Sequence, residues 1–194
     1  MKLYGSLTSP YVRRLRILMS DMEHDFQNVN IFAQTDRDEF RKINPVMKLP
    51  MLEDQTNTEC PYLYDSGVIA EYLLAKQEKP ALSIAEKNVL SVINAASDSL
   101  VSILMLKRSD VDTNQDKLFF NAQRDRVKLC VETLNEQVKQ GKFKQWNYPA
   151  ISLLVFVEWA TFRSLFDFVD YPELLKFVAD NQHQEHVKST FPFD

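Results

Sequence analysis

The fold of this chain is decided by residues 44–54, which read NPVMKLPMLED, and by residues 64–66, which read YDS. The first stretch predicts a tight X-Pro loop that leads into a short apolar strand near residues 51–53. The second predicts a strand that ends at the N-cap of a helix. Such a pair can hold one small anionic peptide, because strand-entry backbone groups offer hydrogen bonds and a helix N-terminus attracts a carboxylate.

A third segment, residues 8–14 with the sequence TSPYVRR, places a hydroxyl at the start of a first helix. Ser9 is a favoured N-cap residue and Pro10 a favoured first helical residue, so capping alone explains the pair. In the same geometry the Ser9 hydroxyl can donate a hydrogen bond to a bound thiolate, and the helix dipole favours negative charge there. Thr8 and Tyr4 are rival hydroxyls, although Tyr4 lies within a strand pattern.

The pattern of apolar residues predicts two domains, an α/β domain over residues 1–76 and an all-α domain over residues 86–194. A polar stretch that ends at Pro80 predicts the linker between them. The expected strands of the first domain lie near residues 1–5, 26–31, 51–53 and 59–64, and its expected helices near residues 10–22, 36–43 and 66–77. Residues 86–107, 115–139 and 149–168 predict helices of the second domain, and a last helix is expected to start at Tyr171. The run from Ile151 to Phe168 is apolar on all sides, which predicts a central buried helix.

Composition disfavours several classes of function. The net charge is −4 and no basic region stands out, which argues against a nucleic-acid surface. No stretch reaches the roughly 18 uncharged apolar residues of a membrane span, so we expect no membrane partner. The two cysteines, Cys60 and Cys130, form no CxxC motif and suit a reducing compartment, which predicts a cytoplasmic protein.

No metal site is expected either. The chain has three histidines and no HExxH motif. His183 and His186 lie three residues apart in a polar tail, where solvated side chains are the more common outcome.

The Leu49-Pro50 and Asp65-Ser66 pairs each have a structural and a functional interpretation. A cis bond before Pro50 would expose the N–H and C=O of Leu49 to a ligand backbone. Lys48 is either a solvated loop lysine or a partner for a carboxylate. Asp65 and Ser66 are explained by capping, but the Ser66 hydroxyl and backbone N–H can also bind a carboxylate, and Asp65 can pair with an ammonium group.

The order and spacing of three motifs resemble the thioredoxin-like domain of the cytosolic glutathione transferases. The motifs are SPYVRR at 9–14, NPxxKLPxL at 44–52 and DSxxIxEYL at 65–73. The chain is similar to bacterial members that carry a serine where other classes carry cysteine or tyrosine. The resemblance covers residues 1–75, and the all-α remainder matches the second domain of the family in length and helix order.

The resemblance implies a glutathione transferase architecture and a role for each matching residue. Ser9 would stabilise the glutathione thiolate, Leu49 would pair through its backbone with the cysteinyl part, and Pro50 would be the family's cis-proline. Asp65 and Ser66 would hold the γ-glutamyl group. Lys48 falls where related classes often carry a basic residue.

The resemblance further implies the reaction and the partners. Glutathione would be the co-substrate, joined to an unidentified small electrophile in detoxification, and the protein would be a homodimer. The electrophile would bind in a cleft between the domains. Leu7, Tyr11, Leu104 and Trp159 are candidates for its apolar lining.

Two departures from the family leave alternatives open. The capping box of the central helix has Ala150 where many members have an acidic residue, so Asn147 would cap without a reciprocal carboxylate. Ser9 stands where glutaredoxin-like members have cysteine, which leaves Cys60 as the protein thiol for a glutathione-dependent reductase or peroxidase. A third possibility is a non-catalytic binding protein that keeps the fold, as the stringent starvation protein A family does.

Overall fold

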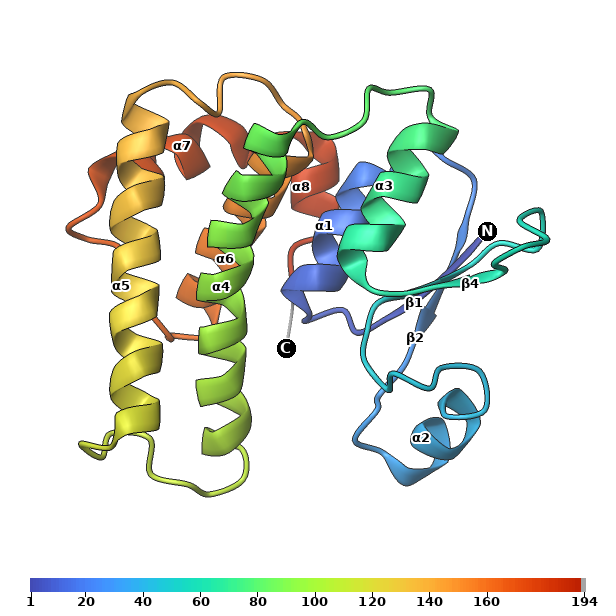
Figure 1. Cartoon of the computed structure of the whole chain (residues 1–194), viewed down its shortest axis with the longest axis horizontal. Coiled ribbons are helices and arrows are strands. Elements are labelled where there is room, and N and C mark those ends of the chain that lie inside the picture. The colour runs from blue at the N-terminus through green and yellow to red at the C-terminus, as the bar shows by residue number, and fades with distance from the viewer. Residues whose placement is uncertain (193–194) are drawn as a thin grey trace. The chain divides into compact units, whose positions relative to one another are not determined.

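The computed structural model describes residues 1–192, which hold four strands and eight helices (Figure 1). In chain order they are β1 (Lys2–Gly5), α1 (Pro10–Leu18), β2 (Asp25–Asn28), α2 (Gln34–Phe40), β3 (Met51–Glu53), β4 (Tyr62–Leu63), α3 (Ser66–Lys76), α4 (Ile84–Lys107), α5 (Leu118–Lys139), α6 (Tyr148–Phe162), α7 (Pro172–Asn181) and α8 (Glu185–Ser189).

The four strands form one mixed sheet in the order β2-β1-β3-β4. β1 pairs in parallel with β2 and antiparallel with β3, and β3 pairs antiparallel with β4. Together with the three helices of this part of the chain, the sheet is thioredoxin-like. The α/β class expected from the sequence is therefore confirmed.

The two faces of the sheet follow the alternation of side chains along β1 and β3. Tyr4 and Met51 pack with Phe40 of α2 and Val29 in one hydrophobic cluster. Gly5 points to the opposite face, where Val12 of α1 lies against it. A Cβ at Gly5 would meet both γ-carbons of Val12. Glycine at position 5 therefore lets α1 approach the sheet more closely than a residue with a side chain would permit.

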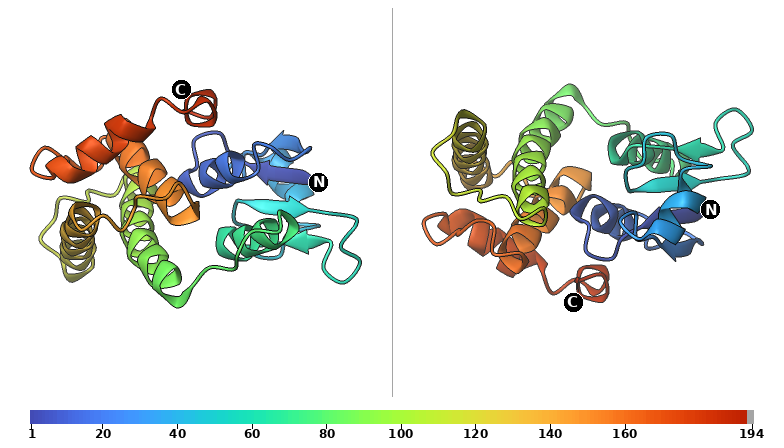
Figure 2. Two further views of the ribbon diagram at one scale, coloured as in Figure 1. Left: turned by 90° about the horizontal axis from the view of Figure 1, so that it is seen from above. Right: turned by 90° about the horizontal axis from the view of Figure 1, so that it is seen from below.

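The second part of the chain is all-helical. α4 and α5 run antiparallel and side by side (Figures 1 and 2). α6 is buried from Tyr148 to Ala160, which confirms the central buried helix. It ends at Phe162, earlier than the apolar pattern predicted, because Ser164 adopts a left-handed backbone conformation (φ 51°). The apolar run continues in a loop where Phe166 and Phe168 pack ring to ring at 4.9 Å.

The N-cap of α6 receives its carboxylate contact from another helix. Asn147 accepts a hydrogen bond from the Ala150 N–H at 3.2 Å and donates one to Glu86 Oε1 at 3.0 Å. The other oxygen of Glu86 closes the capping box of α4 with Ser83. The Glu86 side chain therefore contacts the N-cap residues of two helices, although at α6 it accepts from the Asn147 side chain and not from the backbone N–H that a capping box would use.

The chain divides into two compact units, residues 83–183 and a unit that combines residues 1–82 with the segment from Gln184 onward. The division near residue 82 lies next to the polar stretch that ends at Pro80. The C-terminal segment, expected in the all-α domain, belongs with the first unit. Arg13 of α1 holds it by hydrogen bonds to Val187 O (3.2 Å) and Thr190 Oγ1 (3.4 Å). This segment contains α8, a helix that the sequence pattern did not reveal.

One expectation about membranes needs amendment. By length and composition α4 is apolar enough to cross a membrane, with a mean hydropathy of 1.8 over its most apolar window. Helices that pack inside a protein core meet the same test. α4 packs against α5 and α6, and 33% of that window is buried.

Candidate functional site

The three predicted segments meet at one edge of the sheet. Tyr4 lies opposite Met51, so the end of β1 is next to the start of β3. Leu52 lies opposite Leu63, so the end of β4 is next to that same start. The loop before α1, the Leu49-Pro50 loop and the start of α3 therefore leave the sheet side by side.

Ser9 is the N-cap of α1, as predicted. Its hydroxyl oxygen accepts a hydrogen bond from the Val12 N–H at 3.4 Å, and Pro10 is the first helical residue. The long distance marks a weak capping bond. The side chain is half-buried, and the first turn of α1 contains no acidic residue that would oppose a bound anion.

The hydroxyls of Tyr4 and Thr8, the other candidates for the thiolate donor, each have a different neighbour. Tyr4 O–H donates to Glu53 Oε2 at 2.6 Å on the neighbouring strand. Burial, and then this bond to a carboxylate, raise the pKa of Tyr4 well above its usual value. The Thr8 hydroxyl lies 3.4 Å from that of Ser6 within the loop. Of these three residues, Ser9 is the one whose hydroxyl lies at the N-terminus of α1.

The Leu49-Pro50 loop is built around Asn44. Asn44 is 0% exposed, accepts from the N–H groups of Val46 (2.9 Å) and Met47 (3.2 Å), and donates to Lys48 O at 2.9 Å. The Leu49–Pro50 peptide bond is cis. Within residues 1–192, neither the N–H nor the C=O of Leu49 has a hydrogen-bond partner.

Two features of this loop bear on the sequence interpretation. The structural role of Asn44 was missed, although asparagine before proline is a known turn signal. The Lys48 side chain is exposed at the surface of the loop. Its suggested pairing with a carboxylate stays a prediction.

Asp65 and Ser66 form the start of α3. The exposed Asp65 carboxylate accepts from the N–H groups of Gly67 (2.8 Å) and Val68 (3.4 Å). Ser66 is only 6% exposed, and its hydroxyl oxygen accepts a hydrogen bond from Arg14 Nη2 at 2.8 Å. Both residues therefore have the positions that capping predicts, and their ligand roles stay predictions.

Sequence reasoning missed Arg14 at this site. Arg13 and Arg14 are only 2% and 4% exposed, although arginine side chains on a helix usually face solvent. They are buried because α1 is covered on several sides, by the sheet, by α3 and by the C-terminal segment. A positive charge lies behind the N-terminus of α3 as a result.

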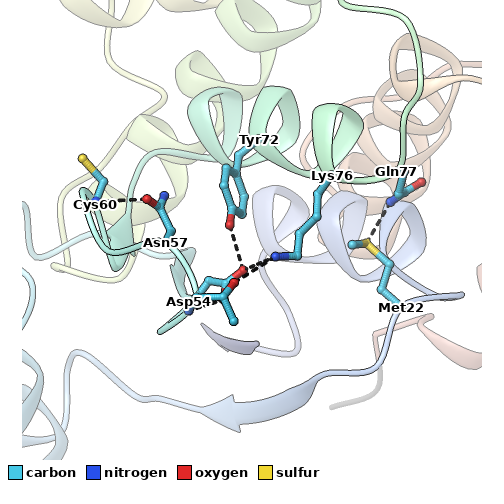
Figure 3. A network of polar contacts seen from close by, with 8 residues as sticks. Met22, Asp54, Asn57, Cys60, Tyr72, Lys76 and Gln77 are labelled. Carbon is cyan, nitrogen blue, oxygen red and sulfur yellow. Dashed lines mark hydrogen bonds and ion pairs between the residues drawn. The ribbon is translucent and has the colours of Figure 1, made fainter.

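A polar network holds the opposite end of β3 (Figure 3). Asp54 is 2% exposed and accepts from Tyr72 O–H and Lys76 Nζ, each at 2.8 Å, and from the backbone and hydroxyl of Thr56 at 3.0 and 2.7 Å. Burial raises the pKa of Asp54, but the hydrogen bonds from Lys76, Thr56 and Tyr72 outweigh it and hold the pKa far below its usual value. The network fixes the β3–β4 turn to α3.

Cys60 lies in this β3–β4 turn, where its N–H donates to Asn57 Oδ1 at 3.1 Å (Figure 3). Its side chain is exposed. The turn follows β3, whereas the Leu49-Pro50 loop precedes it, so Cys60 and the predicted site lie at opposite ends of the strand. The expected strand at residues 59–64 is reduced to Tyr62–Leu63, and Cys60 belongs to the turn.

The candidates for an electrophile pocket differ in exposure. Leu7 is exposed and Tyr11 half-buried, whereas Trp159 is a core residue of α6 and Leu104 is half-buried on α4. Among residues 1–192, no group of three or more potential metal ligands comes together. His186, expected in a solvated tail, lies on α8 with Nε2 3.5 Å from Asp21 Oδ1.

Comparison with known proteins supports the motif resemblance. Residues 3–81 match the family model described as the glutathione S-transferase N-terminal domain. The "Uncharacterized GST-like protein YibF" of Escherichia coli K12 is 28% identical over 204 aligned residues, which span 99% of this chain and 98% of YibF.

Solved structures share the fold over the whole length. A glutathione S-transferase from Methylobacillus flagellatus KT with GSH bound gives a TM-score of 0.86 at 22% identity, over 99% of both chains. A glutathione transferase family member from Pseudomonas fluorescens Pf-5 with bound glutathione gives 0.82 at 19% identity, over 100% of this chain and 99% of that one.

Residues 3–81 therefore resemble the N-terminal domain of the glutathione transferases, and the chain shares the fold of the solved members. The four-stranded sheet with its helices, followed by the helical unit, is the two-domain glutathione transferase architecture.

Proposed function

We propose that this protein is a serine-type glutathione transferase that joins reduced glutathione to small electrophiles. One observation carries the proposal: the Ser9 hydroxyl, the unpaired backbone of Leu49 and the start of α3 lie at the same edge of the sheet. The two structural neighbours that were crystallised with glutathione support the choice of ligand.

In the proposed complex, the backbone of Leu49 pairs with the cysteinyl residue of glutathione as an added strand would. The Asp65 carboxylate accepts from the α-ammonium group of the γ-glutamyl residue. The Ser66 hydroxyl and the N-terminus of α3 bind its α-carboxylate. Lys48 would pair with a further carboxylate of the tripeptide.

Ser9 then acts on the thiol. Its hydroxyl donates a hydrogen bond to the sulfur, and the N-terminus of α1 adds a favourable dipole, so the thiolate is stabilised over the thiol. The thiol proton passes to solvent. The thiolate attacks the electrophilic carbon, a C–S bond forms, and the electron pair of the broken bond leaves with the departing group. Serine forms no covalent bond in this scheme.

The position of Cys60 weighs against a reductase or peroxidase that uses a protein thiol. A thiol must reach the bound sulfur to form a mixed disulfide. Cys60 lies in the turn at the far end of β3. The unpaired Leu49 backbone likewise favours a ligand-binding site over a pure scaffold.

We also propose that the protein is a cytoplasmic homodimer that acts in detoxification. Two free cysteines suit a reducing compartment. Light scattering coupled to size exclusion tests the dimer, and a monomer would remove that part of the proposal.

Calorimetric titration with reduced glutathione tests the site. Ser66→Ala should weaken binding, whereas Ser9→Ala should lower turnover of a chloronitrobenzene by about 10-fold or more with little change in affinity. Ser6→Ala is the matched control, since it removes a hydroxyl from the same loop outside the helix mouth. No binding at millimolar glutathione, or full activity in Ser9→Ala, would refute the assignment.

A further inference from the structure

We propose that Arg14 is a positioning residue that makes the α3 end of the site selective for a ligand with a free α-carboxylate. The inference rests on the proposed glutathione site and deepens it. It concerns one part of the ligand, the α-carboxylate of the γ-glutamyl residue, and leaves the thiol chemistry of Ser9 unchanged.

The geometry of Arg14 joins two elements of the site. Its guanidinium is buried, stacks over the Tyr11 ring at 4.8 Å and donates to Ser66 Oγ at 2.8 Å. The stacking fixes the plane of the guanidinium, and the hydrogen bond fixes the orientation of the Ser66 side chain. Ser66 is the first residue of α3, so its position sets the end of the site.

The hydrogen bond also sets the polarity of the Ser66 hydroxyl. The oxygen accepts from a cation, so its own proton is directed away from Arg14. A hydroxyl polarised in this way is a stronger donor, because hydrogen bonds in a chain strengthen one another. An α-carboxylate bound at the N-terminus of α3 would accept a hydrogen bond from such a donor.

Charge adds to the effect. The Arg14 side chain is cationic, and its burial lessens the screening of its field by water. The N-terminus of α3 carries a partial positive charge in the same place. An anionic group gains from both, whereas a neutral group of the same shape gains little.

A purely structural role is the competing explanation, since Arg14 also ties α1 to α3. A structural role would lower the affinity for every ligand of the site by the same factor. A selective role would lower it for carboxylate-bearing ligands alone. The ratio of the affinity for a carboxylate-bearing ligand to the affinity for a ligand without that carboxylate therefore distinguishes a selective role from a structural one.

The test uses glutathione and its analogue 4-aminobutyryl-cysteinyl-glycine, which lacks only the α-carboxylate. Calorimetry on the full chain gives both dissociation constants for the unchanged protein, Arg14→Met and Arg14→Lys. Arg14→Met should bind glutathione about 10- to 100-fold more weakly, as expected for a lost charged hydrogen bond, with little change for the analogue. Arg14→Lys should recover part of the preference.

Arg16→Met is the matched control. Arg16 is on the same helix, is half-buried and stacks over Phe26 at 5.0 Å, away from Ser66. This variant removes the same charge and should keep the glutathione-to-analogue ratio of the unchanged protein.

The outcomes separate the two proposals. If the unchanged protein binds neither ligand, the proposed function and the role of Arg14 both fall. If it binds glutathione and Arg14→Met weakens both ligands equally, or neither, the role of Arg14 alone is overturned. Should Arg14→Met fail to fold, Arg14→Lys decides: an unaltered ratio overturns the proposal and a reduced ratio supports it.

Discussion

Asp54 offers the sharpest test of how the first unit is held together. Its two carboxylate oxygens have different partners: Oδ1 accepts from Thr56, whereas Oδ2 accepts from Tyr72 and Lys76. Asp54→Asn keeps the shape of the side chain and one of its two acceptor oxygens. An amide that preserves the Thr56 bonds turns its NH₂ group toward Tyr72 and Lys76. The Lys76 ammonium has no acceptor, so its bond to residue 54 is lost, whereas the Tyr72 hydroxyl can accept from the amide.

The magnitude follows from those two contacts. The bond to Tyr72 contributes about 1 kcal/mol, and the charged bond to Lys76 about 1.5–3 kcal/mol when fully buried. The Lys76 side chain is 36% exposed, so its share falls to the low end of that range. The Tyr72 hydroxyl can replace its bond by accepting from the amide, so we expect Asp54→Asn to lower the free energy of unfolding by about 1.5–2 kcal/mol.

The pH dependence has a definite sign. Hydrogen bonds lower the folded-state pKa of Asp54 below its unfolded value, so its contribution is present above the unfolded pKa of about 3.9 and is lost as pH falls below it. The difference between the unchanged protein and Asp54→Asn should therefore be constant from about pH 5 to 8 and shrink below about pH 4.

Urea unfolding followed by far-UV circular dichroism measures the free energy of unfolding of both proteins, and repeating it across pH gives the pH dependence of their difference. Asp38→Asn is the control, because Asp38 is exposed and its ion pair with Arg41 spans 3.7 Å. That variant should stay within about 0.5 kcal/mol of the unchanged protein. Equal stability of Asp54→Asn near neutral pH, or a gap that persists unchanged into acid, would refute the role given to the network.

Three further substitutions test contacts that the fold depends on. Glu86→Ala removes the carboxylate shared by the starts of α4 and α6 and should cost about 1–2 kcal/mol in urea unfolding; an unchanged midpoint would show that the contact to Asn147 contributes nothing. Gly5→Ala places a methyl against Val12 and should cost about 1–3 kcal/mol, whereas a neutral result would mean that α1 can move away from the sheet. Arg13→Met should speed amide hydrogen exchange in residues 184–190 while α5 keeps its protection; unaltered exchange there would contradict the anchoring role.

Local sequence signals predicted much of the fold. The helix starts at Pro10 and Ser66 were predicted correctly because a cap and an N1 proline are features of adjacent residues. The helix bounds were less accurate: α1 ends at Leu18 and not near Met22, although its apolar periodicity continues. Periodicity records which residues face a core, and it does not record where the backbone turns away.

The missed features of the site come from contacts between distant parts of the chain. Arg14 reaches Ser66 across 52 positions, and Asn147 reaches Glu86 across 61. The sequence near Arg14 contains only a basic residue on a helix, for which a solvated face is the usual prediction. Arg14 lies against α3, to which it is hydrogen-bonded through Ser66, and no pattern within α1 encodes that contact.

The nine residues of α1 link three roles that would otherwise be treated separately. Ser9 at its start is the proposed thiolate donor, Arg14 orients Ser66, and the adjacent Arg13 holds the C-terminal segment. A helix of this length is about 14 Å long and moves as one body. A change that shifts α1, such as overpacking at Gly5, should therefore alter ligand affinity and the exchange of residues 184–190 together, whereas Ser66→Ala should alter affinity alone. That contrast separates substitutions that act at the site from those that act through the position of the helix.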